Sequence, residues 1–205
     1  MDAPDDSALP VWPAAERNKQ PILEELQQLI PEGHGTILEV AAGTGQHALH
    51  FAAHFPGYDY YVSDCDPEHL LTLRQRLRTS QAKNLLGPLY LDTTQPNWPL
   101  SQARVIYSAN MIHIAPFEAA LGLLSGAARI LSADGLLLTY GPYKHDGRHI
   151  SESNQAFDLS LRERNPAWGV RDVTELSSAA QQFELKLVET RQLPANNSLL
   201  VFSRS

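Results

Sequence analysis

A short apolar strand that leads directly into a glycine turn and a helix constrains this chain more than any other feature. Thr36–Val40 is apolar apart from Glu39, Gly43 and Gly45 follow it, and a helical pattern begins at Gln46. Glycine allows tight turns and a close approach of the backbone to a ligand, both of which a Cβ would penalise. The segment therefore predicts the first strand–turn–helix unit of an α/β sheet, with a ligand-binding turn at the carboxyl end of the strand.

The remainder of the chain alternates between the same two kinds of element. The patterns predict further strands over 58–63, 86–91, 105–109 and 136–140, and helices over 19–30, 46–55, 67–79, 117–131, 153–163 and 173–182. Two closing strands, 184–191 and 198–203, flank a turn at 194–197 and predict a β-hairpin. This order predicts a doubly wound, mostly parallel sheet, and a seven-stranded sheet with an antiparallel last strand would account for the hairpin.

Length and composition predict one ordinary globular domain over residues 1–205. The first 15 residues, rich in Pro and Asp, are expected to be loosely ordered, and 141–172 form a polar insertion that could cover a substrate. The start of the chain does not resemble a signal peptide, and no apolar run approaches the ~20 residues of a membrane helix. Cys65 is the single cysteine and cannot form an internal disulfide, so we expect a cytoplasmic protein.

The charge balance bears on the class of partner. Sixteen Lys and Arg against 23 Asp and Glu give a net charge of −7. Nucleic-acid binding normally draws on a basic face, and the sequence shows none beyond a local group of Arg162, Arg164 and Arg171. We therefore expect a small molecule as the partner, and neither a membrane nor a nucleic acid.

Two acids near the predicted turn distinguish between cofactors. A carboxylate at Glu39 would be costly to bury without a partner, so a cationic ammonium would suit it, whereas the pyrophosphate of NAD would be repelled. Asp64, at the end of the second strand, could accept hydrogen bonds from the ribose hydroxyls of either kind of cofactor.

Two further polar residues follow the third and fourth strands. Asp92 either joins the acids at the carboxyl edge of the sheet or caps the turn that follows it. Asn110 could donate and accept hydrogen bonds beside a cofactor, or it could be an ordinary turn residue.

The chain resembles the class I S-adenosylmethionine-dependent methyltransferases over almost its whole length, and more narrowly the DUF938 or UPF0585 family, which includes methyltransferase-like protein 26. The motifs that carry the narrower resemblance are the segments 16–23, 37–45, 141–144, 153–158, 168–172 and 194–197. It implies a Rossmann-like, seven-stranded sheet with an antiparallel last strand and helices on both faces.

The resemblance also implies a cofactor and its contacts. S-adenosylmethionine would be used and S-adenosylhomocysteine released. Glu39 would hold the methionine ammonium, Asp64 the ribose and Asp92 the adenine amino group. The residues expected to line the methionine portion are Ala41, Gly43, Gly45 and Asn110.

Two details of this implied site stay open. Arg17 and Asn18 could reach the cofactor carboxylate, or they could cap the first helix. Ala41 stands where the wider class usually has Gly, so we expect a negative φ there and a slightly altered turn.

Methyl transfer is an in-line displacement, in which the protein mainly aligns the nucleophile and excludes water. A general base is needed only when the nucleophile arrives protonated. His113, after the fourth strand, is the best candidate, with Tyr143 as a second; His113 could instead pack against the cofactor or the next helix.

Aromatic, amide and basic side chains in the insertion suit a polar or anionic substrate. The candidates are His145, Asn154, Phe157, Trp168 and Arg171. The alternative is a surface loop with Trp168 tucked into the core.

No metal site is expected. His47, His50 and His54 lie on one side of a helix whose opposite side is apolar, so we expect them to face solvent, and no acid or cysteine completes a zinc-like set.

Three functions remain open: a methyltransferase acting on a small molecule, one acting on protein or RNA, and a non-catalytic S-adenosylmethionine sensor or partner subunit. An NAD-dependent oxidoreductase is a distant fourth, disfavoured by Glu39 and the closing hairpin.

Overall fold

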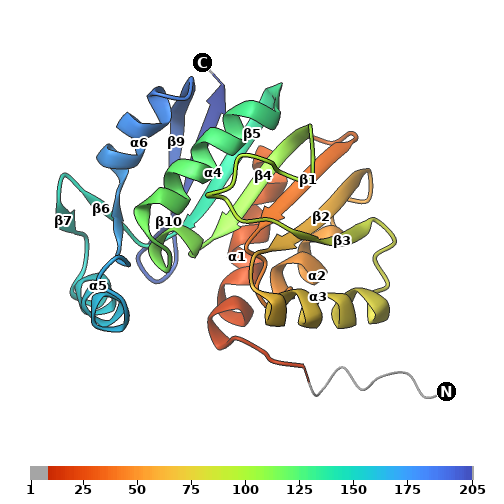
Figure 1. The fold of residues 1–205 in the computed structure, drawn as a ribbon, viewed down its shortest axis with the longest axis horizontal. Helices are drawn as coiled ribbons and strands as arrows, with labels where there is room; N and C mark the ends of the chain where they lie inside the picture. Colours follow the sequence, from red (N-terminus) through yellow and green to blue (C-terminus); the bar gives the residue numbers. More distant parts are fainter. Residues whose placement is uncertain (1–8, 205) are drawn as a thin grey trace. The chain divides into compact units, whose positions relative to one another are not determined.

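The computed structural model describes residues 9–204, and the chain divides into two compact units between Leu91 and Asp92. In Figure 1 the first unit runs from red to yellow and the second from green to blue. The elements of the first unit are α1 (Pro13–Leu29), β1 (Gly35–Val40), α2 (Gln46–Ala52), β2 (Tyr58–Asp64), α3 (Pro67–Thr79) and β3 (Leu85–Tyr90). Those of the second are β4 (Ala103–Ala109), the 3-10 helix η2 (Met111–His113), α4 (Phe117–Ile130), β5 (Leu131–Gly141), β6 (Tyr143–His145), β7 (Arg148–His149), α5 (Glu152–Arg164), β8 (Arg171–Asp172), α6 (Val173–Gln181), β9 (Leu185–Leu193) and β10 (Asn197–Arg204).

The principal sheet has seven strands in the order β3-β2-β1-β4-β5-β10-β9. β1 and β3 pair with β2 in parallel, and β4 pairs with β5 in parallel. The last strand, β10, is antiparallel to both β5 and β9. This confirms the predicted Rossmann-like sheet of the methyltransferase type, including the closing hairpin.

The first unit buries the apolar stripe that the sequence predicts on its first helix. Ile22, Leu23 and Leu26 are at most 1% exposed. The start of α3 also follows the sequence, because the Asp66 side chain accepts a hydrogen bond from an amide of the first turn and Pro67 takes the first helical position.

The N-terminal segment differs from its prediction. Residues 1–8 of the expected loosely ordered stretch lie outside the described residues. The expectation is wrong for 13–15, because α1 begins with Pro at its first position and so starts at Pro13. Before the helix, Pro10 and Trp12 are hydrogen-bonded to side chains of α3 and α2.

In the second unit, α4 lies close to the segment before β4. A Cβ at Gly122 would be 2.1 Å from the carbonyl oxygen of Thr93, and one at Gly126 would be 2.1 Å from the indole of Trp98. Arg129 lies over the same indole, 5.8 Å from its centroid. Only residues without a Cβ permit this approach, so the two glycines fix how closely α4 packs there.

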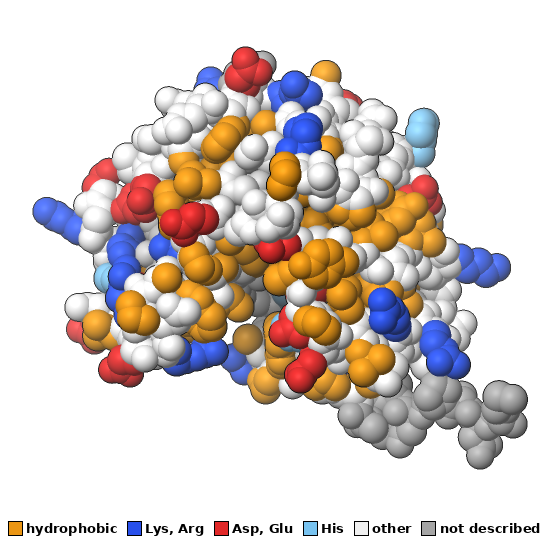
Figure 2. Space-filling view, in the orientation of Figure 1, with side chains coloured by type: hydrophobic (Ala, Val, Ile, Leu, Met, Phe, Trp, Pro, Cys, Tyr) orange, Lys and Arg blue, Asp and Glu red, His pale blue; other side chains and the backbone are white. Residues whose placement is uncertain are grey.

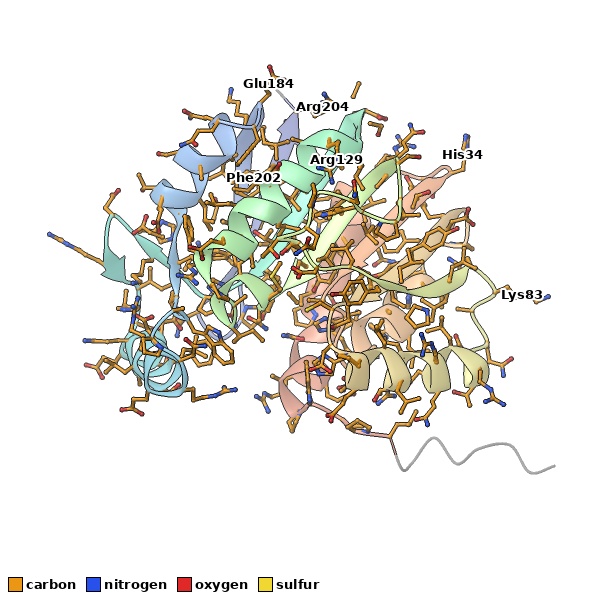
Figure 3. The ribbon with its side chains drawn as sticks, viewed as in Figure 1. His34, Lys83, Arg129, Glu184, Phe202 and Arg204 are labelled. Carbon is orange, nitrogen blue, oxygen red and sulfur yellow. The ribbon has the colours of Figure 1, made fainter. Side chains whose placement is uncertain are left out.

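The hairpin closes the second unit. Phe202 of β10 points into the interior and is 1% exposed, while Arg204 at the end of the strand donates to the Leu131 carbonyl at 3.0 Å (Figure 3). The turn places Ala195 and Asn196 at φ 61° and 57°. The predicted turn at 194–197 is therefore formed by two left-handed residues.

The insertion has more regular structure than its sequence predicts. The expected helix is confirmed as α5, whose N-cap Ser151 accepts from the amide of Asn154. A second, three-stranded sheet in the order β7-β6-β8 was not predicted, since its strands are only two or three residues long. Such short strands carry no readable periodicity.

The packing of α4 generates a prediction about stability. Replacing a helical Gly by Ala alone stabilises by about 1 kcal/mol. At Gly122 the new methyl would collide with backbone, so we expect Gly122→Ala to lower the free energy of unfolding by roughly 1–3 kcal/mol. Urea unfolding would measure this against Ser125→Ala on the same helix, which adds no atoms, and an equally stable Gly122→Ala would contradict the packing.

Candidate functional site

The turn after β1 is built from three left-handed residues. Ala41, Gly43 and Gly45 have φ of 57°, 56° and 78°. The expectation of a negative φ at Ala41 is therefore wrong: the turn requires the left-handed conformation there, and alanine adopts it at a cost of about 1–2 kcal/mol. The turn thus keeps the geometry that glycine would give it.

Glu39 lies near the end of β1 and is 2% exposed. Its Oε2 accepts a hydrogen bond from the Tyr60 hydroxyl at 2.7 Å. Burial raises the pKa of Glu39 to about 8, and the negative charge of Asp64 acts in the same direction, while the Tyr60 hydrogen bond opposes them. A phenol cannot neutralise a carboxylate, so at neutral pH this carboxyl is largely protonated and would ionise beside a cation.

Asp64 ends β2 and joins the turn directly. Its Oδ2 accepts the Gly43 amide at 2.9 Å, and its Oδ1 accepts the Asp66 amide at 2.9 Å. Nδ1 of His69 lies 3.3 Å from Oδ2. The carboxylate is 4% exposed, and each oxygen retains acceptor capacity for a further donor. The structure therefore brings together the turn and the predicted ribose-binding acid.

The two predicted contacts from α1 differ in their surroundings. Asn18 Oδ1 lies 2.7 Å from Nε2 of His47, whereas Arg17 is exposed. Asn18 therefore anchors α1 to α2, and its proposed role at the cofactor carboxylate stays a prediction, as does that of Arg17.

The expectation that His47 faces solvent is wrong. It is 7% exposed and stacks on Phe51, with the ring centroids 5.2 Å apart. Burial lowers its pKa to about 4, with a smaller effect of His50 in the same direction. The physical reason is that α1 covers this side of α2. His54 is exposed as predicted and His50 is partly exposed. Among residues 9–204, no group of three potential metal ligands comes together.

In the second unit, Asp92 makes the contacts of a turn cap. Its Oδ1 accepts from the amide and the hydroxyl of Thr94 at 2.9 and 2.7 Å. Asn110 has a left-handed φ of 60°, starts η2 and donates its amide to the Tyr140 carbonyl at 2.8 Å. Asp92 thus makes the contacts of a cap and Asn110 has the conformation of a turn residue, while the cofactor contacts of both stay predictions.

His113 is fully buried and holds one free polar atom. Its Nδ1 accepts the Arg171 amide at 3.3 Å, and its ring meets Tyr143 edge-on at 5.0 Å. Nε2 has no hydrogen-bond partner among the described residues and points at Gly141, where a Cβ would be 2.3 Å away.

The protonation of this ring follows from its surroundings. Burial lowers the pKa of His113 to about 3, helped by the charge of Arg171 and opposed by the Gly169 backbone and by Asp158. The ring is therefore neutral at pH 7, and the hydrogen bond to Nδ1 places its proton on Nε2. In this tautomer Nε2 is a donor, so the predicted role of general base needs the other tautomer.

Three more candidates are held by structural contacts. The Tyr143 hydroxyl, completely buried, donates to the carbonyl and hydroxyl oxygens of Thr139, and burial raises the pKa of Tyr143. Asn154 donates to the Asn196 carbonyl at 2.9 Å. The Arg171 guanidinium donates to the carbonyls of three residues, Ile112, Ala115 and Ala167. Buried polar groups need such partners, which disfavours direct roles for Tyr143 and Asn154 in chemistry.

The remaining candidates in the insertion are accessible. Phe157 is 38% exposed, and His145 and Trp168 are half-buried. Arg164 lies over the Trp168 ring, 5.0 Å from its centroid. These side chains could contact a bound molecule, and Trp168 is not in the core.

Two polar clusters in the structure were not predicted from the sequence. Asp158 on α5 has Lys144, His149 and Arg162 within 3.4 Å and accepts the Val170 amide at 2.7 Å. Only the four-residue spacing from Asp158 to Arg162 signals it in the sequence. The other cluster surrounds Trp12 at the turn of the first unit, and no local pattern announces it.

The chain matches known proteins in sequence and in fold. The family model described as "Protein of unknown function (DUF938)" matches residues 10–204. Similar solved structures include CalO1, a methyltransferase in calicheamicin biosynthesis in its SAH-bound form, with a TM-score of 0.76 and 16% identity over 94% of this chain and 54% of that one. Human N-acetylserotonin methyltransferase in complex with SAM has a TM-score of 0.77 and 15% identity over 94% and 53%.

A third similar structure is an O-methyltransferase family 2 protein from Planctomyces limnophilus in complex with apigenin, with a TM-score of 0.78 and 16% identity over 94% of this chain and 58% of that one. The chain therefore spans little more than half the length of these structures. At such low identity the likeness establishes the fold.

The raised pKa of Glu39 predicts a pH-dependent stability. The folded pKa of about 8 lies above the unfolded value of 4.5, so the stability linked to this group is present below pH 4.5 and lost as the pH rises through 8. We expect Glu39→Gln to melt higher than the wild type by roughly 5 °C at pH 8.5, and by much less at pH 5. Calorimetric melts with Asp59→Asn, an exposed change on β2, provide the control; a pH-independent difference would contradict the buried acid.

Proposed function

This chain belongs to the DUF938 family, and from that premise we propose that it is an S-adenosylmethionine-dependent methyltransferase acting on a small polar molecule. One observation carries the proposal: a buried glutamate precedes a left-handed turn whose Gly43 amide is bonded to the acid at the end of β2. The SAH-bound and SAM-bound structures of similar fold support the same cofactor.

The residues of the first unit fit the charged and polar groups of this cofactor. Glu39 would hold the ammonium, since a buried carboxylate with only a phenol as partner gains most from a cation. Asp64 would hold the ribose hydroxyls with the acceptor capacity that the Gly43 and Asp66 amides leave. When bound, S-adenosylmethionine would supply an activated methyl group on its sulfonium.

The same two acids disfavour NAD. A pyrophosphate beside Gly43 would add negative charge next to Asp64 and near Glu39. Burial already raises the pKa of Glu39, and repulsion by Asp64 adds to that effect. A sulfonium and an ammonium relieve that repulsion.

In the second unit, His113 offers the group most suited to a reacting molecule. A buried N–H without a partner is costly unless a ligand accepts from it. From its position at Gly141, the Nε2–H would donate to an acceptor oxygen or nitrogen and orient it, because taking a proton at Nε2 would require the other tautomer, with Nδ1–H against the Arg171 amide. The neighbouring Arg171 amide and the Tyr143 ring fix the imidazole plane.

The partner class follows from the accessible side chains and from charge. His145, Phe157 and Trp168 in the insertion would contact a small polar or aromatic acceptor, in keeping with the apigenin in a structure of similar fold. On the face in Figure 2, the described Lys and Arg side chains are interspersed with Asp, Glu and hydrophobic ones and form no continuous basic stripe. No helix among residues 9–204 is long and apolar enough to cross a membrane. We propose a cytoplasmic location on the separate ground that the sequence has a single cysteine, Cys65.

Calorimetric titration tests the cofactor. We expect S-adenosylmethionine and S-adenosylhomocysteine to bind and NAD not to. Asp64→Asn and Glu39→Gln should each weaken binding about 10–100-fold, the usual worth of hydrogen bonds to a charged group. Asp59→Asn should bind normally because this side chain is exposed. Tight NAD binding without a response to either sulfur ligand would overturn the proposal.

Methyl transfer to a fractionated metabolite extract, followed with labelled cofactor, tests His113. We expect His113→Gln to lose about 10²–10⁴-fold in rate while its affinity for S-adenosylhomocysteine stays unchanged, as for a group that acts on the acceptor. Because the pKa of His113 is about 3, the wild-type rate should show no inflection from this ring between pH 5 and 8. His54→Gln, an exposed change on the first unit, should keep the wild-type rate. Full activity of His113→Gln would remove the residue from the reaction.

A further inference from the structure

The residues just before α1, Pro10–Trp12, lie across the turn of the first unit, and we call them the strap. The indole of Trp12 rests on Gly43, since a Cβ at Gly43 would be 2.5 Å from its Cζ3 atom. The indole also meets the ring of His69, near the start of α3, edge-on with the ring centroids 5.4 Å apart. Both residues also lie at the Asp64 carboxylate, whose Oδ2 accepts the Gly43 amide and is 3.3 Å from Nδ1 of His69.

The strap is held by its backbone and not by its side chains. Gln46 accepts the Trp12 amide at 2.6 Å and donates to its carbonyl at 3.3 Å. The guanidinium of Arg76, 5% exposed, donates to the Pro10 carbonyl at 2.7 Å. Val11 and Trp12 are 54% and 43% exposed, so neither side chain is enclosed by the first unit.

The hydrogen bonds that hold the strap are thus separate from the Trp12 indole, which lies over the turn and which we call the cover. Rotation of the indole about its side-chain bonds breaks none of the three backbone hydrogen bonds, and half-exposed rings change rotamer readily. While the ring lies on Gly43 and His69, Asp64 is 4% exposed. Because the ring lies on two residues that contact Asp64, its departure would widen the approach of a ribose hydroxyl to this acid.

We propose that the Trp12 indole is a displaceable cover over the ribose-binding acid Asp64, which occupies the place of the cofactor's nucleoside and swings away when that nucleoside binds. The inference rests on the proposed function, because it takes Asp64 as the ribose ligand. The strap remains attached through Gln46 and Arg76, so the ring can close again after the product leaves.

A cover of this kind lowers the apparent affinity by the fraction of molecules in which it is open. Removing the ring while keeping the anchored backbone should therefore make nucleoside binding faster and tighter. If the Trp12 ring were a fixed part of the site, its removal would delete a contact with the ligand, and binding would become weaker.

Stopped-flow and calorimetric binding of S-adenosylhomocysteine to Trp12→Ala decide between these cases. We expect association about 3–30-fold faster and a correspondingly lower Kd than in the wild type, as for a cover closed in most molecules. Val11→Ala, a neighbouring exposed side chain of the same strap, should bind as the wild type does. Thermal melts verify that both variants are folded.

Hydrogen exchange of the full chain gives a second readout. On addition of S-adenosylhomocysteine, exchange should slow in 41–46 and stay unchanged or quicken in the strap. Slower exchange in both segments, or weaker binding by Trp12→Ala, would show that the Trp12 indole is a fixed part of the binding site. Either result would overturn the proposal of a displaceable cover. Equal binding by wild type and Trp12→Ala would also overturn it while sparing the proposed function. Folded proteins that both fail to bind S-adenosylhomocysteine would instead overturn the proposed function, and the cover with it.

Discussion

The hydrogen bond from the Gly43 amide to Asp64 is the contact on which the rest of the candidate site depends. It fastens the turn after β1 to the end of β2, two points 21 residues apart. It requires a backbone that turns through left-handed conformations at Ala41, Gly43 and Gly45. A Cβ at Gly43 would also strike the Trp12 indole. One amide thus explains why the turn has this shape, why glycine occupies its centre and why Asp64 is buried.

Burial determines the protonation state of Glu39. Desolvation makes this carboxyl costly to ionise and raises the pKa of Glu39 to about 8; the charge of Asp64 acts in the same direction, and the Tyr60 hydrogen bond opposes them. The group is therefore largely protonated at neutral pH, and the stability linked to it is lost as the pH rises through 8 unless a cation lies beside the carboxylate. A positively charged group is therefore the partner that we propose for Glu39, whereas the glycines alone would serve many cofactors.

The sequence predicts what repeats locally and misses what depends on distant partners. The hairpin, the capped start of α3 and the α5 helix follow from periodicity and turn chemistry, and all three are confirmed. The burial of His47 could not be foreseen, because α1 covers it from 29 residues away. The predicted negative φ of Ala41 is wrong, because the turn requires a left-handed conformation there in spite of the preference of alanine for a negative φ. The strap has no local signal in the sequence, because Gln46 lies 34 residues from Trp12 and Arg76 lies 66 residues from Pro10.

The same distinction limits which residues of the insertion can select a methyl acceptor. Three of its buried polar side chains already have partners: Tyr143 in Thr139, Asn154 in the hairpin and Asp158 in the basic side chains around it. They hold the insertion in one conformation, and Arg171 extends this order to η2 and the His113 ring. Specificity must then come from groups that still lack a partner or remain accessible. His113 Nε2 is the clearest of these, since it is buried without a hydrogen-bond partner among the described residues, and this is the observation behind its proposed role at the methyl acceptor.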